Sequence, residues 1–497
     1  MSIKASLSKP FAQLIKRQVN GWAGKALEAQ DAVFKQLIEG AKNTAFGKEH
    51  RFAELNNHTD FAQAVPMRDY EGHRPWIDRM TAGEADILWK GKPIYFCKTS
   101  GTTSGAKYIP ISKESISNHI DAARNALLLY IAETGNTRFV DGKMIFLQGS
   151  PELQEIGGIP LGRLSGIVAH HVPGYLQRNR MPTMATNCID DWEEKLEAII
   201  DETATADMRL ISGIPSWVQM YYERLLERTG KASVSEVFPN YSLFVYGGVN
   251  YEPYRTKFEQ LVGKRIHSIE TYPASEGFIA FQDSQEAEGL LLNVKAGIFY
   301  EFVPVDEFHS ENPTRLSLRD VQIGVNYAIL LSTNAGLWSY NIGDTVKFVS
   351  LNPYRVVVSG RIKHFISAFG EHVIGEEVEY ALREAVAAHP AMVTEFHVAP
   401  QVNPESGLPY HEWFIEFEQP PANPEGFAQH IDVLMQQKNI YYLDLLEGNI
   451  LRPAVITPVK KGGFIEAMRS RGKLGGQNKV PRLANDRKFA DLLAPFV

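Results

Sequence analysis

The chain has 497 residues, 44% of them hydrophobic, and a formal net charge of -7 from 51 basic and 58 acidic residues. This composition is typical of a globular protein with a large core, and the acidic balance excludes the basic surface that nucleic-acid binding requires. Only two cysteines are present, Cys97 and Cys188. Two are too few for a disulfide framework or a cysteine zinc site, so we expect a reducing, cytoplasmic location.

The first 70 residues are expected to be helical. Apolar residues recur there at helical spacing, at Phe11, Leu14, Ile15 and Val19. The pattern predicts a surface helix packed on the core, although a helix lying on a membrane surface has the same pattern. No run of 18 apolar residues exists in the chain, so we expect no transmembrane helix and no membrane partner.

From about residue 90, short β-rich runs alternate with helical stretches. Strand-like runs occupy 93–99, 143–149 and 242–248, and helical patterns occupy Ile116–Glu133, Trp192–Asp201, Trp217–Arg228 and Pro253–Val262. Strands separated by helices of this length predict an α/β fold with crossover connections. After residue 290 the β-rich runs follow one another directly, which predicts a barrel-like or antiparallel subdomain.

The last third of the chain is expected to form a small α+β domain. A helical pattern over Gly375–Ala388 is followed by strand-like runs and a second helical pattern over Phe427–Gln437. We therefore predict a large N-terminal domain over 1–360, a hinge at 361–364 and a small C-terminal domain over 365–497.

A loop rich in glycine and hydroxyl residues follows the first predicted strand. The loop Thr99–Lys107 has five hydroxyl side chains in six positions and ends in a lysine. Glycine allows close backbone approach, successive N–H groups form an anion nest, and hydroxyls add donors. The loop lacks the GxxxxGK[ST] pattern of a Walker loop. It predicts a polyphosphate site, with an ordinary flexible loop as the alternative; the candidate phosphate ligands are Thr99, Ser100, Gly101, Thr102 and Thr103.

Two further motifs contain residue types that suit a nucleotide. Gly248, Val249 and Asn250 follow a predicted strand, where adjacent glycines let a flat ring lie against the backbone. In ETYPASEGF, Tyr272 can stack on a purine, Ser275 can meet a phosphate, and Glu276 can hold Mg²⁺. Each motif, taken alone, also fits an ordinary turn.

Three charged residues in later motifs complete this set. Asp344 stands at a Gly-Asp turn before a predicted strand, where its carboxylate can accept from ribose hydroxyls or cap the local backbone. Arg361, at the predicted domain boundary, can reach ribose or phosphate or form a structural salt bridge. Lys479 follows a double glycine, where it can neutralise charge on a reacting phosphate or belong to a solvated basic turn.

The order and spacing of these motifs are more specific than any one of them. The series TSGTTSGAK, GGVN, YPASE, YNIGD, SGRIK and a late lysine spans residues 99 to 479. It resembles the acyl-CoA synthetase, adenylation-domain and luciferase superfamily, with Ser275 where that superfamily has threonine. The helical N-terminus and the ending GGQNKVPRL are most similar to its auxin-responsive acyl acid amido synthetases, specifically the bacterial members.

The resemblance implies an adenylate-forming enzyme with a mobile C-terminal domain. ATP and Mg²⁺ would be used to activate a small carboxylic acid as acyl-AMP, and an amine, expected to be that of an amino acid, would then take the acyl group. Within the family, the residues matching Ser100, Thr102 and Thr103 hold phosphate. The residue matching Glu276 faces Mg²⁺, that matching Asp344 holds ribose, and that matching Lys479 assists adenylation. The likeness also suggests a monomer.

The second substrate and the acyl pocket stay less defined. An acyl-CoA ligase shares the first half-reaction and is the first alternative, and an inactive nucleotide-binding protein is the second. Candidate acid-binding residues are Arg124, His170 and Trp217, each of which also fits a structural or surface role. Lys363 and His364 follow the Gly-Arg pair where other members often have an acidic or lysine hinge, so the hinge residue is left open.

Overall fold

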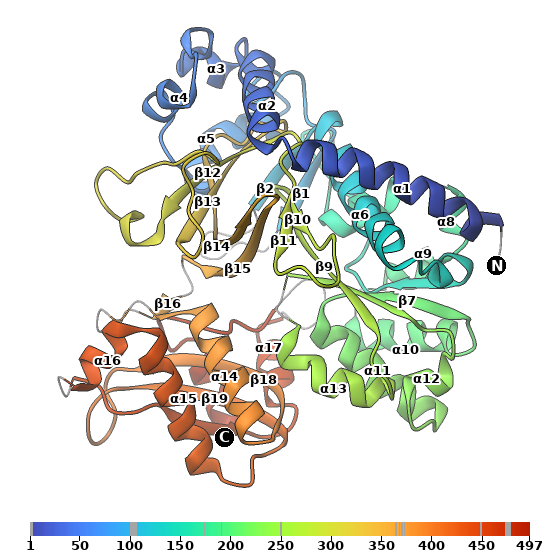
Figure 1. The fold of residues 1–497 in the computed structure, drawn as a ribbon, viewed down its shortest axis with the longest axis vertical. Coiled ribbons are helices and arrows are strands. Elements are labelled where there is room, and N and C mark those ends of the chain that lie inside the picture. Colours follow the sequence, from blue (N-terminus) through green and yellow to red (C-terminus); the bar gives the residue numbers. More distant parts are fainter. Residues whose placement is uncertain are drawn as a thin grey trace. The chain divides into compact units, whose positions relative to one another are not determined.

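The computed structural model describes residues 3–497 except 100–106, 173, 190, 249–250, 363–364, 367, 369–370, 372, 448–449 and 473–478. The chain divides into two compact units (Figure 1). The first comprises Met1–Val249 and Leu261–Val357, and the second comprises Asn250–Gln260 and Val358–Val497. Residues 250–260, which the sequence predicts as part of the large domain over 1–360, group with the second unit, and the first unit ends at Val357.

The helical N-terminus is confirmed. It contains α1 (Ile3–Ala23), α2 (Ala26–Ala41), α3 (Ala45–Glu49), η1 (Phe52–Glu54), α4 (His58–Ala64) and α5 (Tyr70–Thr81). On α1 the buried stripe runs through Ala12, Ile15, Val19 and Ala23, which follow one another at steps of three or four residues, whereas Phe11 and Leu14 are exposed. None of the helices in the described ranges is long and apolar enough to cross a membrane.

An 11-stranded mixed sheet forms the centre of the first unit. Its strand order is β12-β13-β14-β15-β11-β10-β9-β8-β7-β3-β6. Strands β6 (Arg180–Met181), β3 (Lys143–Phe146), β7 (Met208–Ser212), β8 (Leu243–Gly247) and β9 (His267–Ala274) pair in parallel. The connecting segments contain α8 (Gly174–Gln177), α9 (Met184–Asn187), α10 (Trp192–Thr203), α11 (Pro215–Thr229), α12 (Val234–Val237) and α13 (Glu252–Val262). The predicted α/β sheet with crossover helices is therefore confirmed.

The β-rich region after residue 290 extends this same sheet. Its strands are β10 (Gly277–Phe281), β11 (Leu290–Leu292), β12 (Ile298–Pro304), β13 (Asn326–Thr333), β14 (Tyr340–Leu351) and β15 (Tyr354–Arg361), with η3 (Val305–Glu307) after β12. The pairs that link β12 to β13, β13 to β14, β15 to β11 and β11 to β10 are antiparallel. The antiparallel arrangement is thus confirmed as a continuation of the parallel strands.

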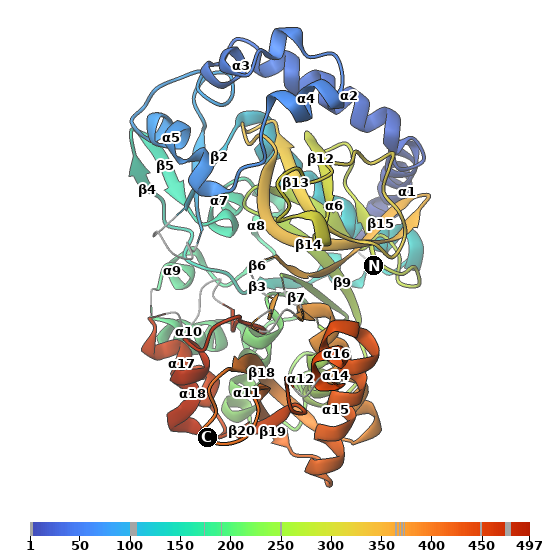
Figure 2. The ribbon, with the colours of Figure 1, turned by 90° about the vertical axis from the view of Figure 1, so that its left-hand side faces the viewer.

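A second, four-stranded sheet carries the predicted phosphate loop. It has the order β2-β1-β5-β4, from β1 (Tyr95–Thr99), β2 (Lys107–Ile111), β4 (Gln154–Ile156) and β5 (Ile159–Gly162). Figure 2 shows β2, β4 and β5 beside α5 and α7 (Leu164–His170). In the chain, α6 (Lys113–Thr134) and η2 (Arg138–Asp141) lie between β2 and β3.

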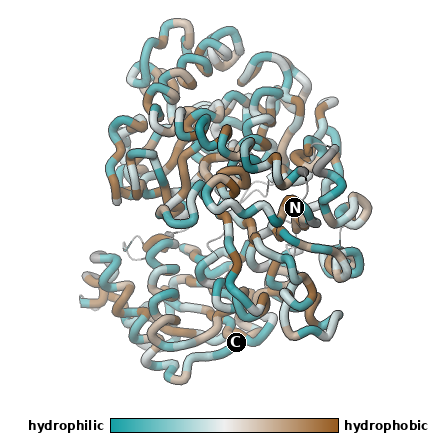
Figure 3. Tube along the Cα trace, turned by 45° about the vertical axis from the view of Figure 1, so that its right-hand side comes forward, coloured by the Kyte–Doolittle hydropathy of each residue, from teal (hydrophilic) through white to brown (hydrophobic). Residues whose placement is uncertain are grey.

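The second unit is the predicted α+β domain. It contains β16 (Phe365–Ile366), β17 (Val373–Ile374), α14 (Gly375–Ala388), α15 (Pro424–Lys438), α16 (Ile440–Glu447), α17 (Gly463–Ser470), α18 (Ala490–Leu493) and η4 (Ala494–Phe496). A three-stranded sheet joins β18 (Met392–Gln401), β19 (Tyr410–Gln419) and β20 (Val455–Val459) in that order. Each unit has its own buried apolar clusters, and Figure 3 shows hydrophobic segments within both.

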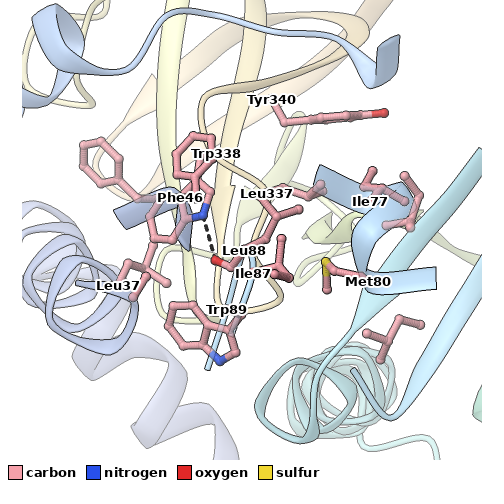
Figure 4. Packing of buried hydrophobic residues seen from close by; sticks show 14 of the residues in the cluster. Leu37, Phe46, Ile77, Met80, Ile87, Leu88, Trp89, Leu337, Trp338 and Tyr340 are labelled. Carbon is pink, nitrogen blue, oxygen red and sulfur yellow. Dashed lines mark hydrogen bonds between the residues drawn. The ribbon is translucent and has the colours of Figure 1, made fainter. Parts of the chain in front are cut away.

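One apolar cluster of the first unit fixes the beginning of β14. Trp338 is fully buried, and its indole Nε1–H donates to the Leu88 carbonyl over 3.0 Å. Figure 4 shows Trp338, Leu337 and Tyr340 packed with Phe46 and residues of α5. The strand that contains the predicted ribose ligand therefore starts from a rigid base.

Candidate active site

The turn between β9 and β10 presents two of the predicted site residues. Ala274 pairs with Gly277, so Ser275 and Glu276 form a two-residue hairpin turn. Cys97 of β1 donates its thiol to Ser275 Oγ over 3.1 Å. Burial raises the pKa of Cys97 to about 12, which keeps the thiol protonated and able to donate at neutral pH. The contact holds this turn against the strand that leads into the glycine-rich loop.

The ends of the glycine-rich loop are paired with each other. Thr99 and Lys107 are opposite residues of the antiparallel β1–β2 pair, so the two strands that flank the loop form a hairpin. The Lys107 ammonium lies 5.7 Å from the ring centroid of Tyr70, whose hydroxyl accepts from the Tyr108 N–H over 2.9 Å. These contacts fix the base of the loop, whereas Ser100, Gly101, Thr102 and Thr103 lie outside the described residues.

Asp344 and Tyr272 come together although 72 residues separate them in the chain. The Tyr272 hydroxyl donates to Asp344 Oδ2 over 2.7 Å. Tyr272 is 6% exposed, and Asp344 is partly buried. Two independently predicted nucleotide ligands are therefore neighbours on the central sheet.

The local structure around Asp344 differs from the predicted turn before a strand. Strand β14 already begins at Tyr340, and Asp344 lies in a bulge within it. Ala328 pairs with Thr345 and Leu330 pairs with Asn341, so residues 342–344 stand opposite one residue of β13. Gly343 has φ +86°, a conformation that favours glycine. Bulges of this kind change the direction of nearby side chains relative to a regular strand.

The carboxyl end of β8 lies beside Tyr272. Gly247 pairs with Thr271 of β9, and the Thr271 hydroxyl donates to the Tyr246 carbonyl over 2.8 Å. A Cβ atom at Gly247 would stand 2.5 Å from the Thr271 carbonyl oxygen, so this approach requires glycine. Gly248 is exposed and has φ +77°; Val249 and Asn250 lie outside the described residues. Ligands of α/β sheets bind at such carboxyl ends.

The available carboxylates fit a magnesium ion bound together with a nucleotide. Within the described part of the chain, no three histidine, cysteine or acidic side chains are grouped to hold a metal ion. Mg²⁺ that accompanies a nucleotide needs only one or two carboxylates, because phosphates and waters complete its octahedral shell. The partly buried carboxylate of Glu276, the predicted ligand, is of the required kind.

Arg361 and Lys479 belong to the second unit. Arg361 is the last residue of β15, and its side chain is exposed. Lys479 is also exposed, and the chain from Pro481 onward is fixed by contacts with β18. Their proposed roles toward a nucleotide stay predictions.

The three candidate acid-binding residues have separate local partners. Arg124 forms an ion pair with Asp121 on α6, with 2.8 Å between Nη1 and Oδ1. His170 is exposed and donates Nε2–H to the Pro151 carbonyl over 2.9 Å. Trp217 is buried and packs on Trp192. These contacts are those of ordinary surface and core side chains, and a role in acid binding stays a prediction.

Sequence reasoning missed a buried ionic cluster next to the start of β14. Glu301 is fully buried; its Oε1 accepts from Arg315 Nη2 over 2.7 Å and from His58 Nε2 over 2.9 Å. Its Oε2 accepts from the Ser339 hydroxyl over 2.6 Å. Burial by itself would raise the pKa of Glu301, but His58 and Arg315 outweigh it and the pKa is lowered. A glutamate in an otherwise apolar strand, IFYEFVP, was the available signal.

Comparison with known proteins covers most of the chain. Residues 16–181 match the GH3 family N-terminal domain, 291–361 its central domain and 376–488 its C-terminal domain. A jasmonoyl–L-amino acid synthetase of Nicotiana attenuata is 22% identical over 64% of this chain and 66% of the relative. The chain thus spans about two thirds of that relative. The indole-3-acetic acid-amido synthetase GH3.15 of Arabidopsis thaliana is 22% identical over 94% of this chain and 92% of the relative.

Solved structures agree with this assignment at the level of the fold. The structure of the GH3.15 acyl acid amido synthetase aligns over 97% of this chain and 96% of its own length, with a TM-score of 0.79 at 16% identity. A 2-hydroxyisobutyryl-CoA ligase in its postadenylation state covers 94% of this chain and 92% of its own, with a TM-score of 0.61 at 13% identity. The fold is therefore that of the adenylate-forming enzymes, and the chain belongs to the GH3 family.

Proposed function

We propose that the protein activates a carboxylic acid with ATP as an acyl-adenylate and then transfers the acyl group to the amine of an amino acid. Membership of the GH3 family supports this activity, as do relatives named jasmonoyl–amino acid and indole-3-acetic acid-amido synthetases. The observation that carries the proposal is the hydrogen bond between Tyr272 and Asp344. This bond joins two of the predicted nucleotide motifs. Tyr272 lies in β9, beside the carboxyl end of β8, and the turn that follows β9 contacts β1.

The chemistry requires little covalent work from the protein. A carboxylate is a poor acyl donor because oxide would be its leaving group. Attack by the carboxylate on the α-phosphate of ATP forms a mixed anhydride and releases pyrophosphate, and the amine then attacks the acyl carbonyl and releases AMP. The protein must position the reactants and neutralise charge on the phosphates.

In this scheme the Asp344 carboxylate accepts hydrogen bonds from the ribose hydroxyls, and Tyr272 positions that carboxylate. The donated hydrogen bond fixes one carboxylate oxygen of Asp344, and the buried Tyr272 ring cannot swing away. The loop between β1 and β2, together with Ser275, would hold the phosphates, and the backbone at 248–250 would lie against the adenine. Magnesium, with Glu276 as its protein ligand, would neutralise phosphate charge.

The second unit would supply Lys479 to the first half-reaction and Arg361 to the nucleotide. Because Lys479 would obstruct the approaching amine, we propose that the small domain over 365–497 moves between the two steps about the hinge at 361–364. The two described cysteines, Cys97 and Cys188, are both free, which supports a cytoplasmic location. We expect a monomer.

The test is ATP–pyrophosphate exchange across a panel of aryl, indolyl and fatty acids, followed by product analysis with amino acids or CoA as acceptor. We expect acid-dependent exchange and an amide product. A thioester formed with CoA, and no amide, would make the protein an acyl-CoA ligase. Binding of ATP without exchange for any acid would indicate an inactive nucleotide-binding protein.

Lys479→Ala provides the first mutational test. Loss of one electrostatic contact to a transition state typically costs about 10²–10³ in rate, and we expect exchange to slow by that factor. Transfer from a supplied acyl-adenylate to the amine should continue, because that step does not need the lysine. Near-normal exchange in this variant would remove Lys479 from the mechanism.

A further inference from the structure

The segment that follows Lys479 is built into the sheet of the second unit. The Val398 N–H donates to the Arg482 carbonyl over 2.9 Å, and the Ala484 N–H donates to the Val398 carbonyl over 3.0 Å. Val398 and Leu483 form a parallel bridge, so these residues extend the edge of β18. His397 donates Nδ1–H to the Pro481 carbonyl over 2.5 Å. The chain is therefore held in place two residues after Lys479.

The Arg482 side chain anchors this segment in a buried charged cluster. Its Nε lies 3.2 Å from Glu395 Oε1, and its Nη2 donates to the Tyr254 hydroxyl. Tyr254 in turn donates to Glu395 Oε2 over 3.0 Å. The guanidinium also lies over the Phe396 ring, 4.4 Å from its centroid. Three side chains thus close a triangle in which each contacts the other two.

Tyr254 brings α13 into this cluster. The part of α13 up to Gln260 belongs to the second unit, and a further ion pair joins Lys257 to Glu418 with 3.5 Å between Nζ and Oε1. Arg482 is therefore held from two sides, by β18 through Glu395 and by α13 through Tyr254. An exposed basic turn at 479–482 would need neither contact.

We propose that Arg482 is a positioning residue for adenylation, which acts by fixing the backbone from which Lys479 reaches the reacting phosphate. This inference rests on the proposed function. A flexible lysine on a free loop would lose most of its catalytic benefit, because charge stabilisation requires donors held in advance at the place where charge develops. The anchored segment 481–484 supplies that fixed base.

The position of Arg482 requires arginine specifically. A planar guanidinium can contact Glu395 and Tyr254 at once and lie flat on Phe396, whereas the ammonium of lysine is a single charge. Arg482→Lys keeps the buried positive charge beside Glu395, so it is the variant least expected to unfold the unit. Tyr254→Phe removes only one hydroxyl and tests the α13 side of the triangle.

The experiment measures the two half-reactions separately. Pyrophosphate exchange reports adenylation, and release of AMP from a supplied acyl-adenylate on addition of an amino acid reports transfer. We expect Arg482→Lys to slow exchange by about 10- to 100-fold, the cost typical of a misplacement near 1 Å, and to leave transfer within about twofold. Tyr254→Phe should shift exchange in the same direction by less.

A double variant with Lys479→Ala tests whether Arg482 acts through Lys479. If Arg482 acts through Lys479, adding Arg482→Lys to Lys479→Ala should cause no further loss of exchange. Arg487→Lys is the matched control, because Arg487 also pairs with a glutamate of the same unit, with 2.9 Å between its Nη1 and Glu412 Oε2, and lies beyond the anchored segment. We expect the control to exchange at the wild-type rate.

Each result decides between positioning and a merely structural role. Equal losses in both half-reactions, or losses that add to those of Lys479→Ala, would overturn the proposal. A normal exchange rate in Arg482→Lys, with Lys479→Ala impaired, would overturn it and leave the proposed function intact. Absence of exchange in the wild-type protein with every acid would refute the proposed function instead.

Discussion

Asp344 is the residue whose loss should most directly report on nucleotide binding. Hydrogen bonds to a charged group contribute about 1.5–3 kcal/mol. We therefore expect Asp344→Ala to raise the KM for ATP by about 10- to 100-fold, measured by pyrophosphate exchange at saturating acid. Tyr272→Phe should raise the KM for ATP by less, because this change only frees the Asp344 carboxylate to reorient. Tyr130→Phe, which removes a hydroxyl bonded to His267, is the control and should leave the KM for ATP unchanged.

The two cysteines should differ in reactivity. Cys97 is fully buried, and burial raises its pKa to about 12, so its thiol stays protonated and unreactive at pH 8. Cys188 is partly exposed. Iodoacetamide at pH 8 should alkylate Cys188 in the native protein and Cys97 only after denaturation, as read by peptide mass spectrometry. Rapid native labelling of Cys97 would contradict the packing of β1 against the 275–276 turn.

At the scale of elements, the ionic cluster around Glu301 should control how firmly the start of β14 is held. Glu301→Gln leaves the Arg315 guanidinium, 8% exposed, without its carboxylate. Breaking a buried pair in this way costs about 3–5 kcal/mol. We expect a clear fall in the midpoint of thermal unfolding, followed by circular dichroism, whereas Glu307→Gln at a partly exposed position should cause little change.

The same cluster predicts a pH dependence of stability. The pKa of Glu301 is lowered on folding, so its contribution is present above the unfolded value of about 4.3 and is lost as the pH falls through the folded value. The unfolding midpoint of the wild-type protein should therefore fall below about pH 4 more steeply than that of Glu301→Gln. Parallel curves for the two proteins would contradict this assignment.

The close approach of β8 and β9 should tolerate no side chain. At Gly247 an added Cβ would stand 2.5 Å from the Thr271 carbonyl oxygen, a backbone atom that cannot move alone. We expect Gly247→Ala to separate the two strands next to Tyr272 and to lower the exchange rate by tenfold or more, a cost typical of about 1 Å of misplacement. Gly21→Ala, where nothing lies within 4 Å of the added atom, should leave exchange unchanged.

At the scale of the whole molecule, the proposed hinge separates the two half-reactions. Proline fixes φ near −65° and removes an N–H, so Lys363→Pro should restrict rotation about the segment 361–364. We expect this variant to keep pyrophosphate exchange and to form amide at least tenfold more slowly, because the second conformation becomes hard to reach. If both rates stay normal, the hinge lies elsewhere.

The secondary structure elements and the site motifs could be predicted from the sequence, because both depend on residues close together in the chain. Strand periodicity and the order of the motifs indicated the α/β sheet and brought Tyr272, Asp344 and Glu276 into one hypothesis. Sequence reasoning could not show that Tyr272 donates to Asp344, or that Glu301 pairs with His58 across 243 residues, because such contacts depend on strand register. It also placed Asp344 before a strand, since a Gly-Asp pair inside a strand reads locally as a turn.

The bulge in β14 has a consequence for how this strand can change in evolution. Pairing resumes on both sides of it, Leu331 with Tyr340 and Tyr327 with Val346, so the two extra residues do not shift the register of the rest of the strand. Loss of one residue from 342–344 would leave two residues opposite one, which is an ordinary bulge, and loss of two would leave a regular strand. Either change leaves Val346 opposite Tyr327. The fold should therefore tolerate deletions at this point, while they remove the local bend that sets the position of the Asp344 carboxylate.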